Sequence, residues 1–272
     1  MLILLIRINA AVFGLVTLLS PWTQNFSVNI YWVEFTWFIP ILLELLVLNH
    51  YKKRFLLYPL FFVAIFVKCL CGYEYLSTIM AASIMFFIAE WFVHKEERWK
   101  LFRSVLVIGI LSVAAFATVY LIHAYYNGFG DIGLGLRYMW SDLVRHRTYG
   151  EADMYIGVTK DSLNASVLVV LWKYIGFGNI NGIFNLMLSV LVVISLVYRN
   201  KVQKIDAKLE TVLFVSSLLA ALSWIVLAKS HSYIHTHINF AMFYLGWAQV
   251  SFYIIFVTLK DKFGFEVKRK TV

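Results

Sequence analysis

Residues 104–124 read SVLVIGILSVAAFATVYLIHA, a run of apolar and small residues without a single charge. A helix needs roughly 20 mostly apolar residues to cross the hydrocarbon core of a membrane. The run therefore predicts a transmembrane helix. Similar apolar runs cover residues 2–20, 29–49, 55–71, 76–93, 180–199, 211–228 and 238–260.

The composition extends this interpretation to the whole chain. The sequence is 61% hydrophobic and 14% charged, whereas soluble domains are about half apolar and about a quarter charged. No internal repeat, low-complexity segment or soluble domain stands out. The sequence thus predicts one all-α integral membrane domain over residues 1–272, a polytopic transmembrane helical bundle with about eight spans.

The positions of the basic residues predict how this bundle is oriented. Cytoplasmic loops of membrane proteins carry an excess of Lys and Arg. Of the 24 Lys and Arg residues, 16 lie in four segments, 51–54, 94–103, 199–208 and 260–272. With these segments inside, both termini and the tail 261–272 are cytoplasmic. The net charge of +9 is then a topology signal, and we expect a lipid bilayer and no nucleic acid as partner.

Residues 162–178 are apolar but short for a span. If they crossed the membrane, every later loop would invert and the basic segment 199–208 would lie outside, against the charge bias. The sequence favours an outer-face interfacial or re-entrant helix there. It is preceded by a long outer-face loop, 125–165, which is rich in aromatic residues and therefore predicted to be ordered.

Acids near the membrane are the first candidates for chemistry. Glu74 is the only acid of the predicted outer turn Gly72–Tyr75. A carboxylate at a low-dielectric boundary can act as acid, base or cation ligand; a solvated turn acid is the alternative. Glu34 lies near the outer end of its run, and an ionisable residue within a span is a functional hypothesis by default. Glu44 lies closer to the inner edge, where we expect it to reach water.

Basic residues of the outer loop are the second group of candidates. Arg145, His146 and Arg147 are consecutive. Arginines bind phosphate through bidentate, charge-assisted hydrogen bonds, so this stretch is a candidate phosphate clamp. Nearby acids, Asp142, Glu151 and Asp153, offer the arginines structural partners instead, and both interpretations remain open.

The segment Lys229–His237 contains three histidines, His231, His235 and His237. In a helix, residues four apart share a face, as His231 and His235 would. Such a set can bind a transition metal, or an anionic headgroup together with Lys229; loop packing is the third possibility. No cysteine or nearby acid completes a metal site. The sequence therefore assigns no metal ligand or certain cofactor, and leaves a divalent metal at the outer face open.

The outer loops, the Gly72–Tyr75 turn and the Lys229–His237 turn resemble the distal part of bacterial type C glycosyltransferases. These polytopic enzymes transfer a sugar from a polyprenyl-phosphate carrier on the outer side of the membrane. The resemblance implies transfer of a hexosyl or pentosyl group in cell-envelope glycan assembly, from a lipid-phosphate-linked substrate. It also implies that the protein is located in a bacterial inner (plasma) membrane. The catalytic candidates are Glu74, Glu34 and Asp131, and the substrate-binding candidates are Arg145, Arg147, Lys229, His231, His235 and His237.

The first outer loop departs from that family. The family carries a catalytic Asp or Glu there, whereas residues 21–29 contain no acid. Either the catalytic loop belongs to a missing upstream part, or the chain is a non-catalytic scaffold or truncated homologue. A transporter, flippase or polymerase subunit is a further alternative, although such proteins place polar residues near the bilayer midplane, where this sequence looks apolar.

Overall fold

The computed structural model describes residues 11–12, 14–27 and 33–263, and every regular element within them is helical, as predicted. The α-helices are α2 (Pro21–Ser27), α3 (Phe35–Asn49), α4 (Arg54–Leu70), α5 (Leu76–Ala82), α6 (Met85–Val93), α7 (Arg98–Asn127), α8 (Ile132–Met139), α9 (Gly157–Asn164), α10 (Val167–Tyr174), α11 (Ile180–Lys201), α12 (Lys208–Leu227), α13 (Lys229–Ile234), α14 (Thr236–Asn239) and α15 (Trp247–Phe263). The short 3-10 turns are η1 (Tyr51–Lys53), η2 (Lys95–Glu97), η4 (Ala152–Met154) and η5 (Phe240–Tyr244), and η3 (Trp140–Tyr149) is a π-helix.

Four helical segments of the described chain are long and apolar enough to cross a membrane. They are α5 with α6, η2 with α7, α11, and α12. The segments Thr236–Tyr244 and Trp247–Phe263 meet at a bend of 51° and make a fifth if they act as one span. All five lie at predicted apolar runs. By the length and composition of its helices, the chain is a multi-span integral membrane protein.

The other three predicted spans are not established by helix length. The run 29–49 corresponds to α3, which has 15 residues, and the run 55–71 to α4, which has 17 residues. The run 2–20 and the tail 261–272 lie largely outside the described residues. The number of eight spans therefore stays a prediction.

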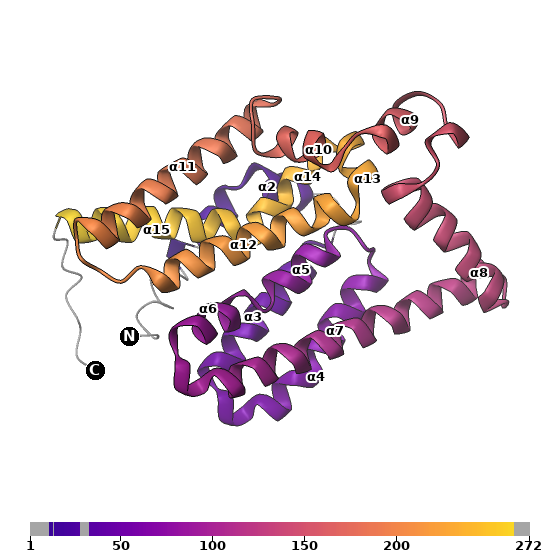
Figure 1. The fold of residues 1–272 in the computed structure, drawn as a ribbon. Helices are drawn as coiled ribbons and strands as arrows, with labels where there is room; N and C mark the ends of the chain where they lie inside the picture. The colour runs from indigo at the N-terminus through magenta and orange to yellow at the C-terminus, as the bar shows by residue number, and fades with distance from the viewer. Residues whose placement is uncertain (1–10, 13, 28–32, 264–272) are drawn as a thin grey trace.

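The predicted outer-face loop 125–165 is mostly helical, which corrects its description as a loop. Helix α7 has 30 residues, so at 1.5 Å per residue it is about 45 Å long, well beyond a hydrocarbon core of about 30 Å. Helix α8 and η3 then fold back from its far end (Figure 1). Gly128 and Gly135 permit this hairpin, because a Cβ at either would collide with backbone, that of Asp131 or Ala124 respectively.

The predicted single helix at 162–178 is also wrong in form. The chain makes two short helices there, α9 and α10, separated at Ala165. The Ser166 hydroxyl accepts a hydrogen bond of 3.2 Å from the Val169 N–H and so caps the start of α10. A capping side chain competes with continuation of the preceding helix, which explains the break. Neither helix is among the candidate spans of the described chain.

The long helices pack side by side and define two ends of the molecule. Helix α7 packs along α4, the α5–α6 pair packs on α12, and α11 packs on α15. In Figure 1 the connections η2 and α11–α12 lie at one end, and α9, α10, α13 and the α4–α5 turn lie at the other. We call these the inner and the outer end, following the charge bias of the loops.

The α5–α6 span is interrupted, and a buried acid from another helix bridges the interruption. Helix α5 ends at Ala82 and α6 begins at Met85. Glu44 of α3 accepts a hydrogen bond of 2.9 Å from the Phe87 N–H through Oε1. A helix start leaves backbone N–H groups without intrahelical partners, and Glu44 satisfies one of them. Glu44 is 0% exposed, so the expectation that it reaches water is wrong.

Replacing Glu44 tests this bridge. Glu44→Ala is expected to destabilise the protein by about 1–3 kcal/mol, because a buried N–H loses its acceptor. Glu44→Gln should cost less, since its amide oxygen can still accept. Thermal unfolding of the purified protein in detergent measures both, with the exposed Glu96→Ala as control. Equal melting temperatures for all three variants would contradict a bridging role.

Candidate functional site

The turn Gly72–Tyr75 between α4 and α5 is anchored at both ends. The Lys68 ammonium, buried in the last turn of α4, donates a hydrogen bond of 2.7 Å to the Gly72 carbonyl oxygen. The Tyr75 hydroxyl donates to Asn239 Oδ1 at 3.0 Å. Tyr75 also takes a left-handed backbone, φ 58°, which is uncommon for a residue other than glycine. Its contacts, rather than local preference, therefore fix the turn.

These anchors direct Tyr73 and Glu74 toward other elements. The Tyr73 hydroxyl lies 2.7 Å from His123 Nδ1 on α7, and Glu74 Oε1 lies 3.9 Å from Arg147 Nη1 on η3. Gly72 has φ 134°, and a Cβ there would collide with the Glu74 carboxylate. Only glycine at position 72 permits both this backbone and this placement of Glu74.

Arg147 lies between two carboxylates without bonding tightly to either. Its guanidinium nitrogens are 3.9 Å from Glu74 and 3.7 Å from Asp142, beyond the usual hydrogen-bond range of about 2.7–3.2 Å. Within the described chain Arg147 has no hydrogen-bond partner, and its side chain is 37% exposed. Its N–H donors are therefore oriented by charge and remain available to a ligand.

The π-helix η3 explains why Asp142 and Arg147 meet. They are five residues apart, and the hydrogen bonds of a π-helix join residues i and i+5, so both side chains lie on one face. In an α-helix this spacing would turn them apart. Such π-helical stretches are rare and occur frequently at functional sites. No sequence pattern predicted this π-helix.

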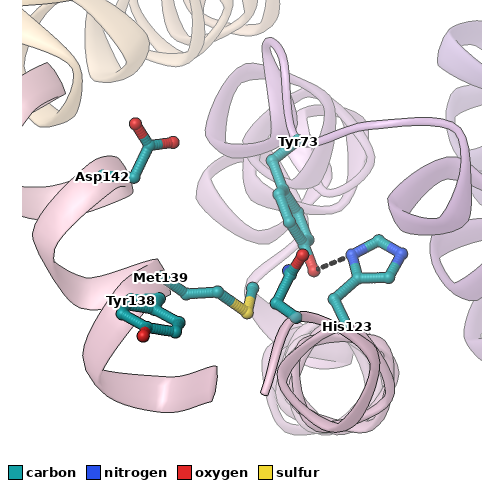
Figure 2. Close-up of a pocket in the computed structure, with 6 residues that line it drawn as sticks. Tyr73, His123, Tyr138, Met139 and Asp142 are labelled. Carbon is teal, nitrogen blue, oxygen red and sulfur yellow. Dashed lines mark hydrogen bonds between the residues drawn. The ribbon is translucent and has the colours of Figure 1, made fainter. Parts of the chain in front are cut away.

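A cavity of about 340 Å³ lies beside this group, between α7, η3 and the α4–α5 turn. Its lining includes Tyr73, His123, Tyr138, Met139 and Asp142. Figure 2 shows the Tyr73 hydroxyl pointing at the His123 ring, with Asp142 across the space on η3. The sequence did not predict the Tyr73–His123 pair, because Tyr73 lies in the α4–α5 turn and His123 lies far along the chain on α7. The available signal was a histidine at the end of the apolar run 104–124.

The three predicted histidines do cluster, on α13 and the start of α14. The ring centroids of His231 and His235 are 4.5 Å apart, and those of His235 and His237 are 6.0 Å apart. Burial, the nearby His235 ring and the charge of Arg147 lower the pKa of His231 to about 3. Burial, His237 and Arg147 also lower the pKa of His235. Near neutral pH both rings are uncharged, so they offer hydrogen bonds rather than positive charge.

The ammonium group of Lys229 is hydrogen-bonded to backbone carbonyl groups. It is buried and donates to the carbonyl oxygens of Leu163 and Ala165, at 2.5 and 2.8 Å. These carbonyls lie at the end of α9, where intrahelical partners are lacking. Lys229 thus ties α13 to the α9–α10 junction, and its predicted contact with substrate has no geometric support here.

The remaining candidates lie apart from Arg147 and Glu74. Arg145 pairs with Glu151 at 3.1 Å, so it does not form one clamp with Arg147. Asp131 caps α8 by accepting a hydrogen bond of 3.0 Å from the Leu134 N–H. Glu34, at the start of α3, has Thr23 of α2 as its hydrogen-bond partner.

A metal centre has no support from these residues. Within the described chain no group of three or more His, Cys, Asp or Glu side chains is placed to hold a metal ion. Zinc and related ions in proteins take at least three such ligands at about 2.0–2.3 Å. The divalent metal left open by the sequence therefore finds no ligand set in this part of the structure.

The class that the fold and site define is a multi-span helical membrane protein with a polar site of mixed charge at one end of its bundle. Comparison with known proteins adds no more specific identity: no family model, no curated protein and no solved structure matches the chain.

The histidine cluster makes stability depend on pH. The usual pKa of histidine is 6.5 and that of buried His231 is about 3, so between these pH values the unfolded chain binds a proton that the folded protein excludes. Stability should fall as the pH is lowered through this window. Melting temperatures across it should decline less steeply for His231→Gln than for the unchanged protein. The exposed His50→Gln should leave the slope as it is; a similar flattening in both variants would refute the assignment to His231.

Proposed function

We propose that the outer-end site binds the phosphate of a lipid-linked sugar, and that the protein transfers the sugar as a glycosyltransferase of cell-surface glycan assembly. The observation that carries this proposal is Arg147, whose guanidinium is oriented by Glu74 and Asp142 and yet free of hydrogen bonds to described residues. Arginine matches the geometry of phosphate oxygens through paired N–H donors.

The site also offers the base that glycosyl transfer needs. The acceptor hydroxyl loses its proton to a carboxylate while its oxygen forms a bond to the anomeric carbon. The bond from that carbon to the phosphate oxygen breaks, and its electron pair leaves with the phosphate. Glu74 or Asp142 would take the proton, and Arg147 would stabilise the charge developing on the phosphate. The neutral rings of His231 and His235 contribute hydrogen bonds to the same region.

The surroundings suit a substrate held in the bilayer. Helices α7 and α8 and the start of η3 present exposed aromatic side chains next to the site, among them Tyr126, Tyr138 and Trp140. Tyr and Trp are enriched where a membrane meets water. A lipid-linked donor can keep its chain among such residues while its phosphate reaches Arg147.

The two arginines of η3 provide a matched test. Arg147→Ala is expected to lower sugar transfer from polyprenyl-phospho-sugar donors by about 10²-fold, because charge stabilisation of the leaving phosphate is lost. Arg145→Ala, which removes the surface pair with Glu151 and a hydrogen bond to Met154 Sδ, should leave the rate nearly unchanged. Glu74→Gln and His235→Ala should also reduce the rate of sugar transfer, because both residues belong to the same outer-end site. Equal rates in the Arg147 and Arg145 variants would defeat the proposal.

A transporter or flippase is the second candidate, and the broken α5–α6 span favours it. Transporters often build their sites from interrupted transmembrane helices with polar groups at the break. Here Glu44 Oε2 is buried at such a break with no described hydrogen-bond partner. Proteoliposomes distinguish the two functions: flux of a lipid-linked sugar that is unaffected by Arg147→Ala, with no sugar transfer, would favour transport.

A further inference from the structure

The inner end of the bundle contains a larger cavity, of about 720 Å³. It lies where α3, α6 and α7 meet the ends of α11, α12 and α15. Figure 1 shows these helix ends together, at the opposite end of the molecule from α9 and α13. Cavities of about 300–1,000 Å³ are typical of sites for small ligands and cofactors.

One part of the lining is apolar and suits a hydrocarbon chain. Leu48, Leu101, Leu209 and Val257 contribute from four different helices. Because this end of the bundle lies at the predicted cytoplasmic boundary of the membrane, these side chains continue the apolar environment of the bilayer into the protein. A wholly water-soluble ligand would leave them without complementary surface.

Most charged groups of the lining already have partners. Arg199, 5% exposed, donates hydrogen bonds to Asp261 at 2.7 Å and to Glu210 at 3.2 Å. Glu97 is paired with Lys100 at 3.0 Å. These ion pairs fix the walls of the cavity. Because their charges are already paired, these residues interact only weakly with a ligand.

Three charged side chains of the lining have no ion-pair partner within the described part of the chain: Lys208, Lys260 and Asp206, whose Oδ1 accepts a hydrogen bond of 3.0 Å from the Lys208 N–H. Of these, Lys208 lies at the start of α12 and Lys260 near the end of α15. The loop before Lys208 is held in place, since Gln203 donates to the Thr258 carbonyl oxygen at 3.2 Å and Asn200 Oδ1 accepts from the Ala207 N–H. Two ammonium groups on fixed elements, facing one cavity, suit an anionic group.

We infer that the inner cavity binds an anionic amphiphile, with its phosphate or carboxylate group at Lys208 and Lys260 and its hydrocarbon chain against the apolar walls. This site is separate from the outer-end site, and the inference does not depend on sugar transfer. The chemistry is that of an anionic membrane lipid of the cytoplasmic leaflet, and free phosphate shares only its charged half.

Lipid retention by the whole protein tests this site. The protein is exchanged into mixed phosphatidylcholine and phosphatidylglycerol, and bound lipid is counted by native mass spectrometry. Lys208→Gln with Lys260→Gln should weaken phosphatidylglycerol binding by about 100-fold, the effect of two lost charge-assisted hydrogen bonds. The matched pair Lys201→Gln with Lys204→Gln removes the same charge from exposed lysines of the same connection, and should retain the lipid.

Two further measurements keep the outcome decisive. Leu209→Trp fills the apolar part without altering charge and should also displace phosphatidylglycerol, which covers the case in which the double lysine variant fails to fold. Inorganic phosphate should compete poorly, since it lacks the chain. Equal lipid loss from both lysine pairs, retention by Leu209→Trp, or full competition by inorganic phosphate would each overturn the inference.

Discussion

The constraint on which this structure depends is that backbone polar groups inside an apolar medium need partners. Continuous helices meet this requirement internally, but several helices of this protein are interrupted. At three interruptions a charged or ionisable side chain supplies the partner: Glu44 for the Phe87 N–H, Lys68 of the preceding turn for the Gly72 carbonyl oxygen, and Lys229 for the carbonyls at the end of α9. Unpaired, each group would cost the free energy of desolvation.

The same requirement shapes the outer-end site. Lys68 and Tyr75 fix the α4–α5 turn through their hydrogen bonds. The backbone position of Glu74 is therefore fixed, although its carboxylate forms no buried ion pair within the described chain. Lys229 fixes the α9–α10 junction, so the positive charge nearest the histidines that remains open to a ligand comes from Arg147. The proposed site residues are thus the charged side chains that are not needed as hydrogen-bond partners of the backbone.

The sequence predicted what depends on average hydropathy and missed what depends on single contacts. The apolar runs located α7, α11 and α12, because a span leaves a signal over some 20 residues. The hairpin of α7 and α8 was missed since its glycines serve close packing, whereas glycine also signals loops. The pairing of Tyr73 with His123 and the winding of η3 depend on tertiary contacts. The sequence marks only His123, as a histidine at the end of an apolar run, and carries no local trace of its partner or of the π-helix.

Two arginines show how similar surroundings lead to different roles. Arg199 and Arg147 each lie between two carboxylates, but Arg199 is buried with hydrogen bonds of 2.7 and 3.2 Å, whereas Arg147 is 37% exposed with contacts of 3.9 and 3.7 Å. Breaking a buried pair leaves a desolvated charge, so Arg199 cannot release its partners to a ligand. Arg147 can exchange weak, solvated attractions for direct hydrogen bonds to an anion at small cost. Distance and burial, rather than residue type, thus separate a structural arginine at the inner end from the arginine proposed to bind a ligand at the outer end.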